Sequence, residues 1–302
     1  MYDELQIRTI ASLDSRIENI AVLPAVITRL AALDLDAPNA NEEIVALVRS
    51  DPTLALRLMR LANSSLHGTR EVDTIPGAIL RVGAQGLAKI LLALSVVEVF
   101  VPHTRGQRNL WIHSIQTALA ARRLAALRPD LPLGMEECFL AGLLHDIGRF
   151  VIFEHRQQEM AQIDEADVTS PQELIAAERQ ACGFDHAALG YEVCRRWNLP
   201  DSVCKMVRAH HLYREERHRV PTEVTALVRL VQEADCLSFG LLRNPASSFH
   251  SEIDRNRAIE MSLQPLAASE RILPTGKLAA QLIDIDDEAR TAAAGINIAY
   301  SK

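Results

Sequence analysis

Apolar residues recur three and four positions apart through most of the chain, and strict alternation of apolar and polar residues over strand-like lengths is scarce. An interval of three or four residues places side chains on one face of an α-helix, whereas a half-buried strand needs an interval of two. The pattern therefore predicts an all-α protein.

Helix boundaries are marked at several points along the chain. The pairs Asp51-Pro52 and Ser170-Pro171 each place a capping side chain before a proline, and Gly183 follows the apolar pattern that starts at Pro171. A proline in the first helical turn costs no hydrogen bond, and glycine readily takes the left-handed conformation that ends helices. These signals predict helices that begin at 52 and 171, the second ending near 183.

The kind of polar residue found among the apolar positions changes along the chain. Residues 18–105 have the pattern of short helices with few polar groups suited to chemistry, and residues 106–240 have the pattern of longer helices that carry many histidines and aspartates. Residues 241–302 return to ordinary amphipathic helix. We therefore expect an N-terminal extension over 1–17, an N-terminal helical subdomain, a histidine-rich helical subdomain and a C-terminal helical extension.

Composition and charge narrow the classes of partner. The chain has 302 residues, 48% of them hydrophobic, and a net charge of -7. This is enough apolar surface for a substantial core, and the acidic balance disfavours general binding to nucleic acid or to anionic membranes. Partners are expected to be proteins or small ligands. The five cysteines form no Cys-x-x-Cys pair, which fits reduced thiols.

Two further observations concern location. The N-terminus lacks the basic and then apolar layout of a signal peptide. The longest apolar stretch, 90–97, is far shorter than the roughly 20 residues that span a bilayer. We therefore expect a cytoplasmic protein without a membrane span.

A set of imidazoles and carboxylates lies within the predicted apolar helices. Such groups must be paired, hydrated or metal-bound, because an unpartnered polar group in a core costs several kcal/mol. The pattern therefore predicts a single site. Its seven members are His113, His145, Asp146, His186, His210, His211 and Asp235.

The predicted helices suggest how these residues meet. A helix over 139–148 would separate His145 and Asp146 by about 100°, so both can line one cavity. His113 would lie near the start of a helix over 111–120, and Gly142 and Gly148 would let neighbouring backbones approach closely. His186 would open a later helix, His210 and His211 would lie at the end of the next one, and Asp235 would lie within the stretch 232–236.

Mixed imidazole and carboxylate donors suit Fe, Mn or Zn, and a bridging aspartate would support one or two divalent ions. Arg149, three residues beyond Asp146, lies on the face where it can contact an anion. The alternative is a polar network in which these groups satisfy one another without metal.

The ordered motifs of the chain resemble the HDOD domain, an output domain of bacterial signalling related to the HD phosphohydrolases. The resemblance covers roughly residues 18–240. It rests on the segments 23–30, 50–68, 74–83, 110–113, 141–148, 185–186, 197–200 and 210–211.

This resemblance implies an N-terminal helical bundle packed against an HD-like subdomain. It also implies a regulatory role linked to two-component or cyclic-dinucleotide signalling, with catalytic activity often doubtful. The seven residues of the site occupy positions similar in order and spacing to the metal ligands of HD-GYP phosphodiesterases, so the resemblance implies a largely intact ligand set.

Three departures from the HD-GYP pattern bear on catalysis. No Gly-Tyr-Pro loop follows His210-His211, Asn109 stands where those enzymes usually carry an acidic ligand, and Arg149 replaces a lysine. Arginine and lysine differ in how they hold phosphate, so these changes weigh against turnover more than against folding.

Three functions remain open. The leading hypothesis is a non-enzymatic signalling module that binds regulatory proteins of a signalling pathway and uses the site as a structural or sensory centre. The rival is a metal-dependent phosphohydrolase acting on a nucleotide or cyclic dinucleotide, with Asp146 and Arg149 in catalytic roles. The third is a receptor that binds such a nucleotide through Arg149, Lys205 and Arg208 without cleaving it.

Overall fold

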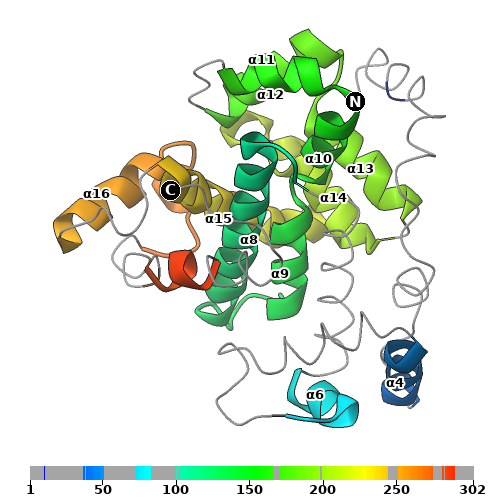
Figure 1. Ribbon diagram of the computed structural model, residues 1–302. Coiled ribbons are helices and arrows are strands. Elements are labelled where there is room, and N and C mark those ends of the chain that lie inside the picture. The colour runs from blue at the N-terminus through cyan, green and yellow to red at the C-terminus, as the bar shows by residue number, and fades with distance from the viewer. Residues whose placement is uncertain are drawn as a thin grey trace. The chain divides into compact units, whose positions relative to one another are not determined.

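Every regular element in the part of the chain that the structure describes is a helix, which confirms the all-α prediction (Figure 1). The structure is a computed structural model. It describes residues 10, 37, 39–50, 72–82, 100, 102–165, 170–197, 199–243, 251–274, 281 and 283–289. The predicted helix start at Asp51-Pro52, the motif over 23–30 and most of the motif over 50–68 lie outside these residues.

The chain divides into two compact units. One comprises residues 21–101 and 197–199, and the other comprises residues 1–20, 102–196 and 200–302. In the first unit, α4 (Ala40–Ser50) contacts α6 (Ile75–Val82), and α4 buries Ile44 and Leu47. The four-part division expected from the sequence stays a prediction.

The second unit holds the candidate site. Its longer helices are α8 (Arg105–Ala126), α9 (Met135–Leu144), α10 (Ile147–His155), α11 (Gln157–Glu165), α12 (Pro171–Cys182), α13 (His186–Arg196), α14 (Asp201–Ala209), α15 (Thr225–Arg243) and α16 (Glu252–Ser262). The short 3-10 helices are η2 (Arg214–Arg219), η3 (Thr222–Val224) and η5 (Ala268–Glu270).

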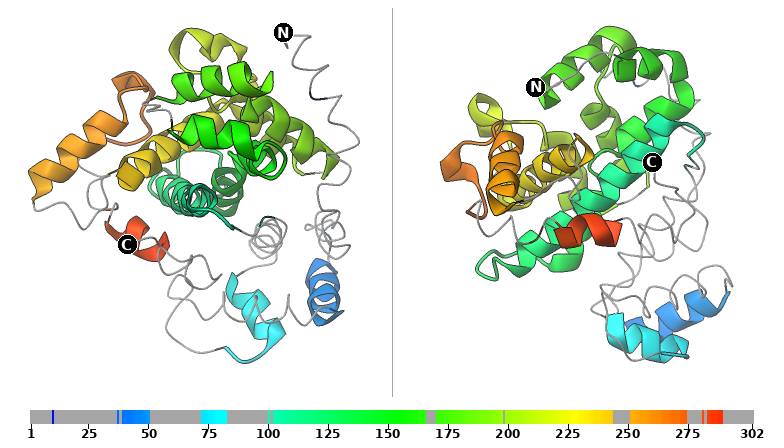
Figure 2. Two further views of the ribbon diagram at one scale, coloured as in Figure 1. Left: turned by 45° about the horizontal axis from the view of Figure 1, so that its top comes forward. Right: turned by 60° about the vertical axis from the view of Figure 1, so that its left-hand side comes forward.

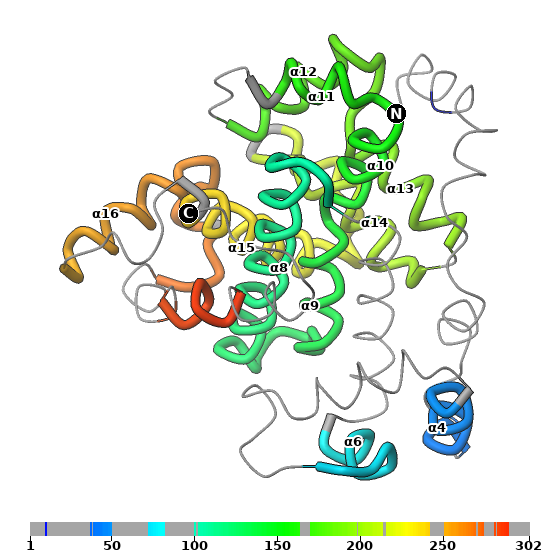
Figure 3. The backbone as a smooth tube through the Cα atoms, viewed as in Figure 1, coloured from blue at the N-terminus to red at the C-terminus, as the bar shows by residue number. Residues whose placement is uncertain are grey.

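Helix α8 is central to this unit, because it packs along both α9 and α15 (Figures 1 and 3). Its first turn is closed by a capping box, in which the Thr104 hydroxyl accepts a hydrogen bond from the Gln107 backbone N–H and the Gln107 Oε1 accepts one from the Thr104 backbone N–H. These bonds satisfy donors that the helix itself leaves free. Trp111, on the same helix, stacks at 4.3 Å between ring centroids on Phe150 of α10.

Helix α12 has the boundaries that the sequence predicted. Ser170 accepts a hydrogen bond from the Glu173 N–H, Pro171 opens the helix, and Gly183 ends it with a φ of 82°. That φ lies in the left-handed region, which favours glycine. The turn at Gly183 ends α12 three residues before α13 begins at His186.

Two glycines permit close crossings of backbone, as expected. A Cβ on Gly142 would lie 2.8 Å from the Ala118 Cα of α8, and a Cβ on Gly148 would lie 2.0 Å from the carbonyl oxygen of His186 on α13. Any side chain at these positions would therefore push α9 from α8, or α10 from α13. Both crossings hold candidate site residues next to one another.

Two simpler expectations can also be compared with the structure. No helix among the described residues is both long enough and apolar enough to cross a bilayer. The five cysteines are buried and carry free thiols, as the sequence suggested.

Candidate metal centre

The seven predicted residues converge in two adjoining groups (Figure 2 shows the helices that carry them). They come from α8, from the turn between α9 and α10, from the start of α13, from the end of α14 and from α15. Within each group the nitrogen and oxygen atoms that could act as ligands all lie within 4.8 Å of one another. The first group is His113, His145 and Asp235, and the second is Asp146, His186, His210 and His211.

The first group is centred on His113. Its Nε2 lies 3.1 Å from the Nε2 of His145 and 3.2 Å from the Oδ1 of Asp235. The Nε2 of His145 is 3.7 Å from the same aspartate oxygen. Two nitrogens and one oxygen therefore face a common point.

The second group is centred on His186. Its Nε2 lies 3.0 Å from the Oδ1 of Asp146, 3.2 Å from the Nε2 of His210 and 3.0 Å from the Nε2 of His211. The Nε2 of His210 is 3.7 Å from the same oxygen of Asp146. Three nitrogens and one oxygen face this second point.

Asp146 connects the two groups, because each of its oxygens faces a different one. Oδ2 lies 3.7 Å from the Nε2 of both His113 and His145, whereas Oδ1 faces His186 and His210. A carboxylate in this position can contact two cations at once. The arrangement is compatible with one ion or with two.

The prediction that His145 and Asp146 share one continuous helix is wrong. Helix α9 ends at Leu144 and α10 begins at Ile147, and Asp146 has φ −98° and ψ 17°, outside the helical region. The break lets α10 turn away and place Gly148 against the α13 backbone. The two side chains meet the cluster from a bend in the chain and not from one helical face.

The other elements agree more closely with expectation. His186 is the first residue of α13, and His210 follows the last residue of α14 as its C-cap. His113 lies further inside its helix than expected, because α8 already begins at Arg105. Asp235 lies in the interior of α15.

Four of the five imidazoles are oriented by a contact at their outer nitrogen. The Nδ1 of His145 donates to the Gly142 carbonyl and that of His210 to the Val207 carbonyl, each at 2.7 Å. The Nδ1 of His113 lies 2.9 Å from the Ser238 hydroxyl. Such contacts hold the ring so that Nε2 points inward, as in many protein metal sites.

The fourth outer contact comes from Glu178, which the sequence analysis missed. This glutamate of α12 is fully buried, and its Oε2 accepts hydrogen bonds from the His186 Nδ1 at 2.6 Å and from the His186 backbone N–H at 2.9 Å. Its Oε1 lies 3.5 Å from the Nε of Arg149, and the Nη1 of Arg149 is 3.9 Å from the Oδ2 of Asp146. Arg149 is therefore held between two acids of the site.

Electrostatics differ between the groups. Burial lowers the pKa of His145 to about 4, so this ring is neutral near pH 7 and, with its proton on Nδ1, turns a lone pair into the cluster. Burial would also lower the pKa of His186, but the carboxylates of Glu178 and Asp146 raise it to about 10. Burial alone would raise the pKa of Asp146, and the imidazoles of His145 and His186 instead hold it well below its usual range.

These donors fit a divalent cation. Ligand atoms about 2.1 Å from one ion lie roughly 3.0–3.4 Å apart in octahedral or tetrahedral geometry. Several separations in the cluster, from 3.0 to 3.2 Å, have this size. The buried His and Asp groups can thus bind a metal ion, with two carboxylates to balance its charge.

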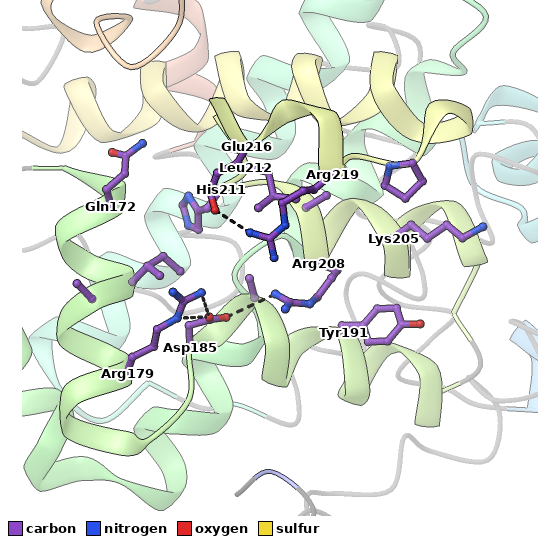
Figure 4. A pocket seen from close by; sticks show the side chains of 15 residues that line it. Gln172, Arg179, Asp185, Tyr191, Lys205, Arg208, His211, Leu212, Glu216 and Arg219 are labelled. Atoms are coloured by element: carbon purple, nitrogen blue, oxygen red, sulfur yellow. Dashed lines mark hydrogen bonds and ion pairs between the residues drawn. The ribbon is translucent and has the colours of Figure 1, made fainter. Parts of the chain in front are cut away.

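A cavity of about 440 Å³ adjoins the second group. His211 lines it, together with the cations Arg179, Lys205, Arg208 and Arg219 (Figure 4). Each cation lies near a carboxylate: Arg179 and Arg208 approach Asp185, Lys205 contacts Asp201 and Glu223, and Arg219 contacts Glu216. Arg149 is not among the residues that line this cavity.

Comparison with known proteins identifies the family. The HDOD domain matches residues 20–213, which include six of the seven site residues but not Asp235. The crystal structure of an HDOD domain protein with unknown function from Geobacter sulfurreducens has 25% sequence identity and a TM-score of 0.71, and the match covers 95% of this chain and 98% of that chain.

Two further proteins are similar to the chain. A candidate phosphohydrolase from Shewanella amazonensis SB2B has a TM-score of 0.72 at 21% identity, with 95% of this chain and 98% of that chain covered, so the likeness concerns the fold alone. An uncharacterized protein of Treponema pallidum is 28% identical over 205 residues, which is 67% of this chain and 39% of that relative. The chain therefore spans well under half the length of this curated relative. With its all-helical fold and the HDOD match over most of its length, the chain belongs to the HDOD domain family.

Proposed function

We propose that this chain is a signalling module that binds one or two divalent ions and acts through regulatory proteins without turning over a substrate. The observation that carries the proposal is the position of Asp146, whose two oxygens face two separate groups of imidazole nitrogens. Ions bound by these two groups would stabilise the packing of helices that are distant in the sequence.

The donor set supports Fe, Mn or Zn as the ion. Five imidazoles and two carboxylates are the ligand types that these metals accept, whereas calcium prefers sites made wholly of oxygen. A divalent ion bound here would supply positive charge to the buried carboxylates and could polarise water. The ligands would be His113, His145, Asp146, His186, His210, His211 and Asp235.

The access to these donors supports a non-enzymatic role. Of the seven residues, only His211 lines the described cavity, and the side chains of the other six are at most 8% exposed. A phosphate ester must contact the ions directly to be cleaved by them. Arg149, which would otherwise hold the phosphate, is occupied by Asp146 and Glu178.

Elemental analysis of the purified full chain tests the metal, and assays with bis(p-nitrophenyl) phosphate and a cyclic dinucleotide test turnover, each with and without added Mn²⁺ or Fe²⁺. We expect bound metal that is lost in Asp146→Ala and kept in the exposed control Asp254→Ala. Hydrolysis that requires Asp146 would contradict the proposal and favour the phosphohydrolase.

A second candidate, a receptor for a phosphorylated ligand, is favoured by one observation. The cavity beside His211 is lined by four cations, among them Lys205 and Arg208. Titration calorimetry with inorganic phosphate and with a cyclic dinucleotide would test it. Binding that is lost in Arg208→Ala, with the metal content unchanged, would support the receptor.

A further inference from the structure

A buried chain of hydrogen bonds leads from the candidate metal centre to the C-terminal helical segment, defined here as residues 281 and 283–289. His113 Nδ1 lies 2.9 Å from the Ser238 Oγ, and that hydroxyl is 3.0 Å from the Oε1 of Gln116. The Nε2 of Gln116 then donates to the Oδ1 of Asp286 at 3.0 Å. These four side chains form the relay.

The relay is isolated from water. His113, Ser238, Gln116 and Asp286 are between 1% and 6% exposed. In such surroundings a lost hydrogen bond is not replaced by one to solvent, so each member depends on its neighbour. A change in the hydrogen bonding of His113 can therefore alter the hydrogen bonding of Asp286.

The segment docks on α8 through contacts of two kinds. Ile285 and Ala289 are buried, and Asp286 meets Gln116 as described. Arg123 of α8 holds the same segment independently of the relay, since it bonds to Gln281 at 2.8 Å and pairs with Asp284 and Glu288. Figure 3 shows the segment, in red, beside α8.

A metal ion would fix the direction of the relay. With Nε2 of His113 bound to metal, the ring proton must be on Nδ1, which then donates to Ser238. The single proton of the serine hydroxyl is left to bond Gln116 Oε1, or the His113 carbonyl at 3.1 Å. When the hydroxyl bonds Gln116, the amide is held with its oxygen toward Ser238 and its nitrogen toward Asp286.

Without a metal, two acceptors compete for that proton. The Nε2 lone pair of His145 and the carboxylate of Asp235 both face the Nε2 of His113, at 3.1 and 3.2 Å. A neutral ring with its proton on Nε2 turns an acceptor toward Ser238, which must then donate to His113 and no longer to Gln116. Gln116 then keeps its bond to Asp286 but loses the hydrogen bond that holds its amide oxygen.

We propose, resting on the metal binding proposed above, that occupancy of the centre controls how firmly the C-terminal segment is held on α8. The segment and Ser238 lie beyond residues 20–213, the part that matches the HDOD domain. The segment that responds to metal binding would thus lie outside the part of the chain that matches the HDOD domain. Because coupling is reciprocal, docking of the segment must also strengthen metal binding.

Hydrogen exchange measured by mass spectrometry on the full chain, with and without Mn²⁺, tests this. We expect Mn²⁺ to slow exchange in peptides covering 283–289 about fivefold, a usual size for coupling between sites. Peptides of α16 serve as the internal reference, because the relay does not reach that helix. Equal slowing in both peptides would contradict the relay.

Three variants separate the relay from simple docking. Ser238→Ala and Asp286→Ala, which remove the hydroxyl and the acceptor of the relay, should keep bound Mn²⁺ but lose its effect on exchange in the segment. Arg123→Ala should speed exchange with and without metal and keep the ratio, because Arg123 holds the segment without contacting the relay. Asp286→Ala should also weaken Mn²⁺ binding by about the factor that the metal exerts on exchange.

The outcomes distinguish this inference from the function on which it rests. Two results would overturn the relay and leave the proposed metal centre unaffected. One is stoichiometric binding of Mn²⁺ with no change of hydrogen exchange in the segment. The other is an undiminished effect of Mn²⁺ on that exchange in Ser238→Ala. A wild-type chain that binds no Mn²⁺, Fe²⁺ or Zn²⁺ overturns both.

Discussion

Among single residues, Glu178 fixes the geometry of the second group. It accepts two hydrogen bonds from His186, one from Nδ1 and one from the backbone, while remaining fully buried. Removing such an outer partner of a metal-bound histidine commonly costs 10–100-fold in affinity. We therefore expect Glu178→Ala to weaken metal binding by about that factor, measured by competition with a chromophoric chelator.

Two companion variants give this prediction its control. Glu178→Gln keeps an oxygen that can accept from Nδ1, so its loss should be smaller than that of the alanine variant. Glu173→Ala removes an exposed glutamate from the same helix and should leave metal affinity unchanged. Equal affinities for Glu178→Ala and Glu173→Ala would show that Glu178 does not position His186.

Gly148 sets the distance between α10 and α13. An alanine Cβ would lie 2.0 Å from the His186 carbonyl oxygen and 2.8 Å from the Gly190 nitrogen, and backbone atoms cannot move aside as a side chain can. We expect Gly148→Ala to lower the free energy of unfolding in urea by about 3 kcal/mol, at the upper end for overpacked sites.

The control is Gly134→Ala, where the nearest atom to the new Cβ is 3.9 Å away and φ is −76°. Because Gly134 is the N-cap of α9, its loss should still cost up to about 1 kcal/mol. Similar costs for the two alanine variants would mean that the crossing can relax.

The convergence of the seven candidate residues could be predicted from the sequence, but the contact that Glu178 makes with them could not. Histidines and aspartates within apolar helices require partners, so their convergence follows from the cost of burying them. Glu178 lies on an amphipathic helix with several other charged residues, and no local feature separates it from the exposed Glu173. Its burial depends on how α12 is placed against the rest of the fold, which is a tertiary property.

At the scale of elements, the periodicity of apolar residues predicted that helices form, but it did not predict where a helix is interrupted. Residues 139–148 have the pattern of one apolar helix, yet the chain bends at His145 and Asp146. The bend accompanies the close contact of Gly148 with α13, and no spacing of apolar residues encodes such a contact. His145 falls in the first group of candidate ligands and Asp146 in the second, so this bend lies at the division between the two groups.

A second element-scale feature ties α15 to a later segment. Glu233 of α15 is buried and accepts the backbone N–H groups of Ile272 and Leu273. Burial raises the pKa of Glu233 to about 7, from an ordinary value of 4.5. The folded chain therefore retains a proton that the unfolded chain releases near pH 4.5.

This difference gives stability a defined dependence on pH. The contribution of Glu233 to the free energy of unfolding is largest below about pH 4.5. It declines by on the order of 3 kcal/mol as the pH rises to 7. Urea unfolding of Glu233→Gln should lose this part of the pH dependence, because the amide does not titrate. The exposed control Glu154→Gln should retain the wild-type profile. Parallel profiles for wild type and Glu233→Gln would contradict the assignment.

For the whole molecule, the centre joins segments that are far apart in sequence, from His113 on α8 to Asp235 on α15. An ion bound to them would favour the folded chain, since the unfolded chain cannot present all seven groups together. At a free metal concentration 100 times the Kd, this linkage contributes about 2.7 kcal/mol. Removal of the metal with a chelator should therefore lower Tm by several degrees.

The size of that Tm difference should increase with pH. In the metal-free chain the carboxylates of Glu178 and Asp146 raise the pKa of His186 to about 10 against the opposing effect of burial. A metal ion must displace this proton, so between about pH 6.5 and 10 its affinity should rise up to tenfold per pH unit from this group alone. The metal-free chain loses stability over the same range, because the unfolded imidazole releases its proton near 6.5.

Thermal unfolding of the metal-loaded and the chelator-treated chain at pH 6, 7.5 and 9 measures how the Tm difference increases with pH. Calorimetric titration with Mn²⁺ in two buffers of different ionisation enthalpy counts the protons that metal binding releases. We expect about one proton from His186 near pH 8. In Glu178→Gln the metal-free His186 loses one of its two carboxylate neighbours, so the Tm difference should widen less with pH. A Tm difference that is the same at all three pH values would show that metal and proton do not compete for His186, and would remove this residue from the ligand set.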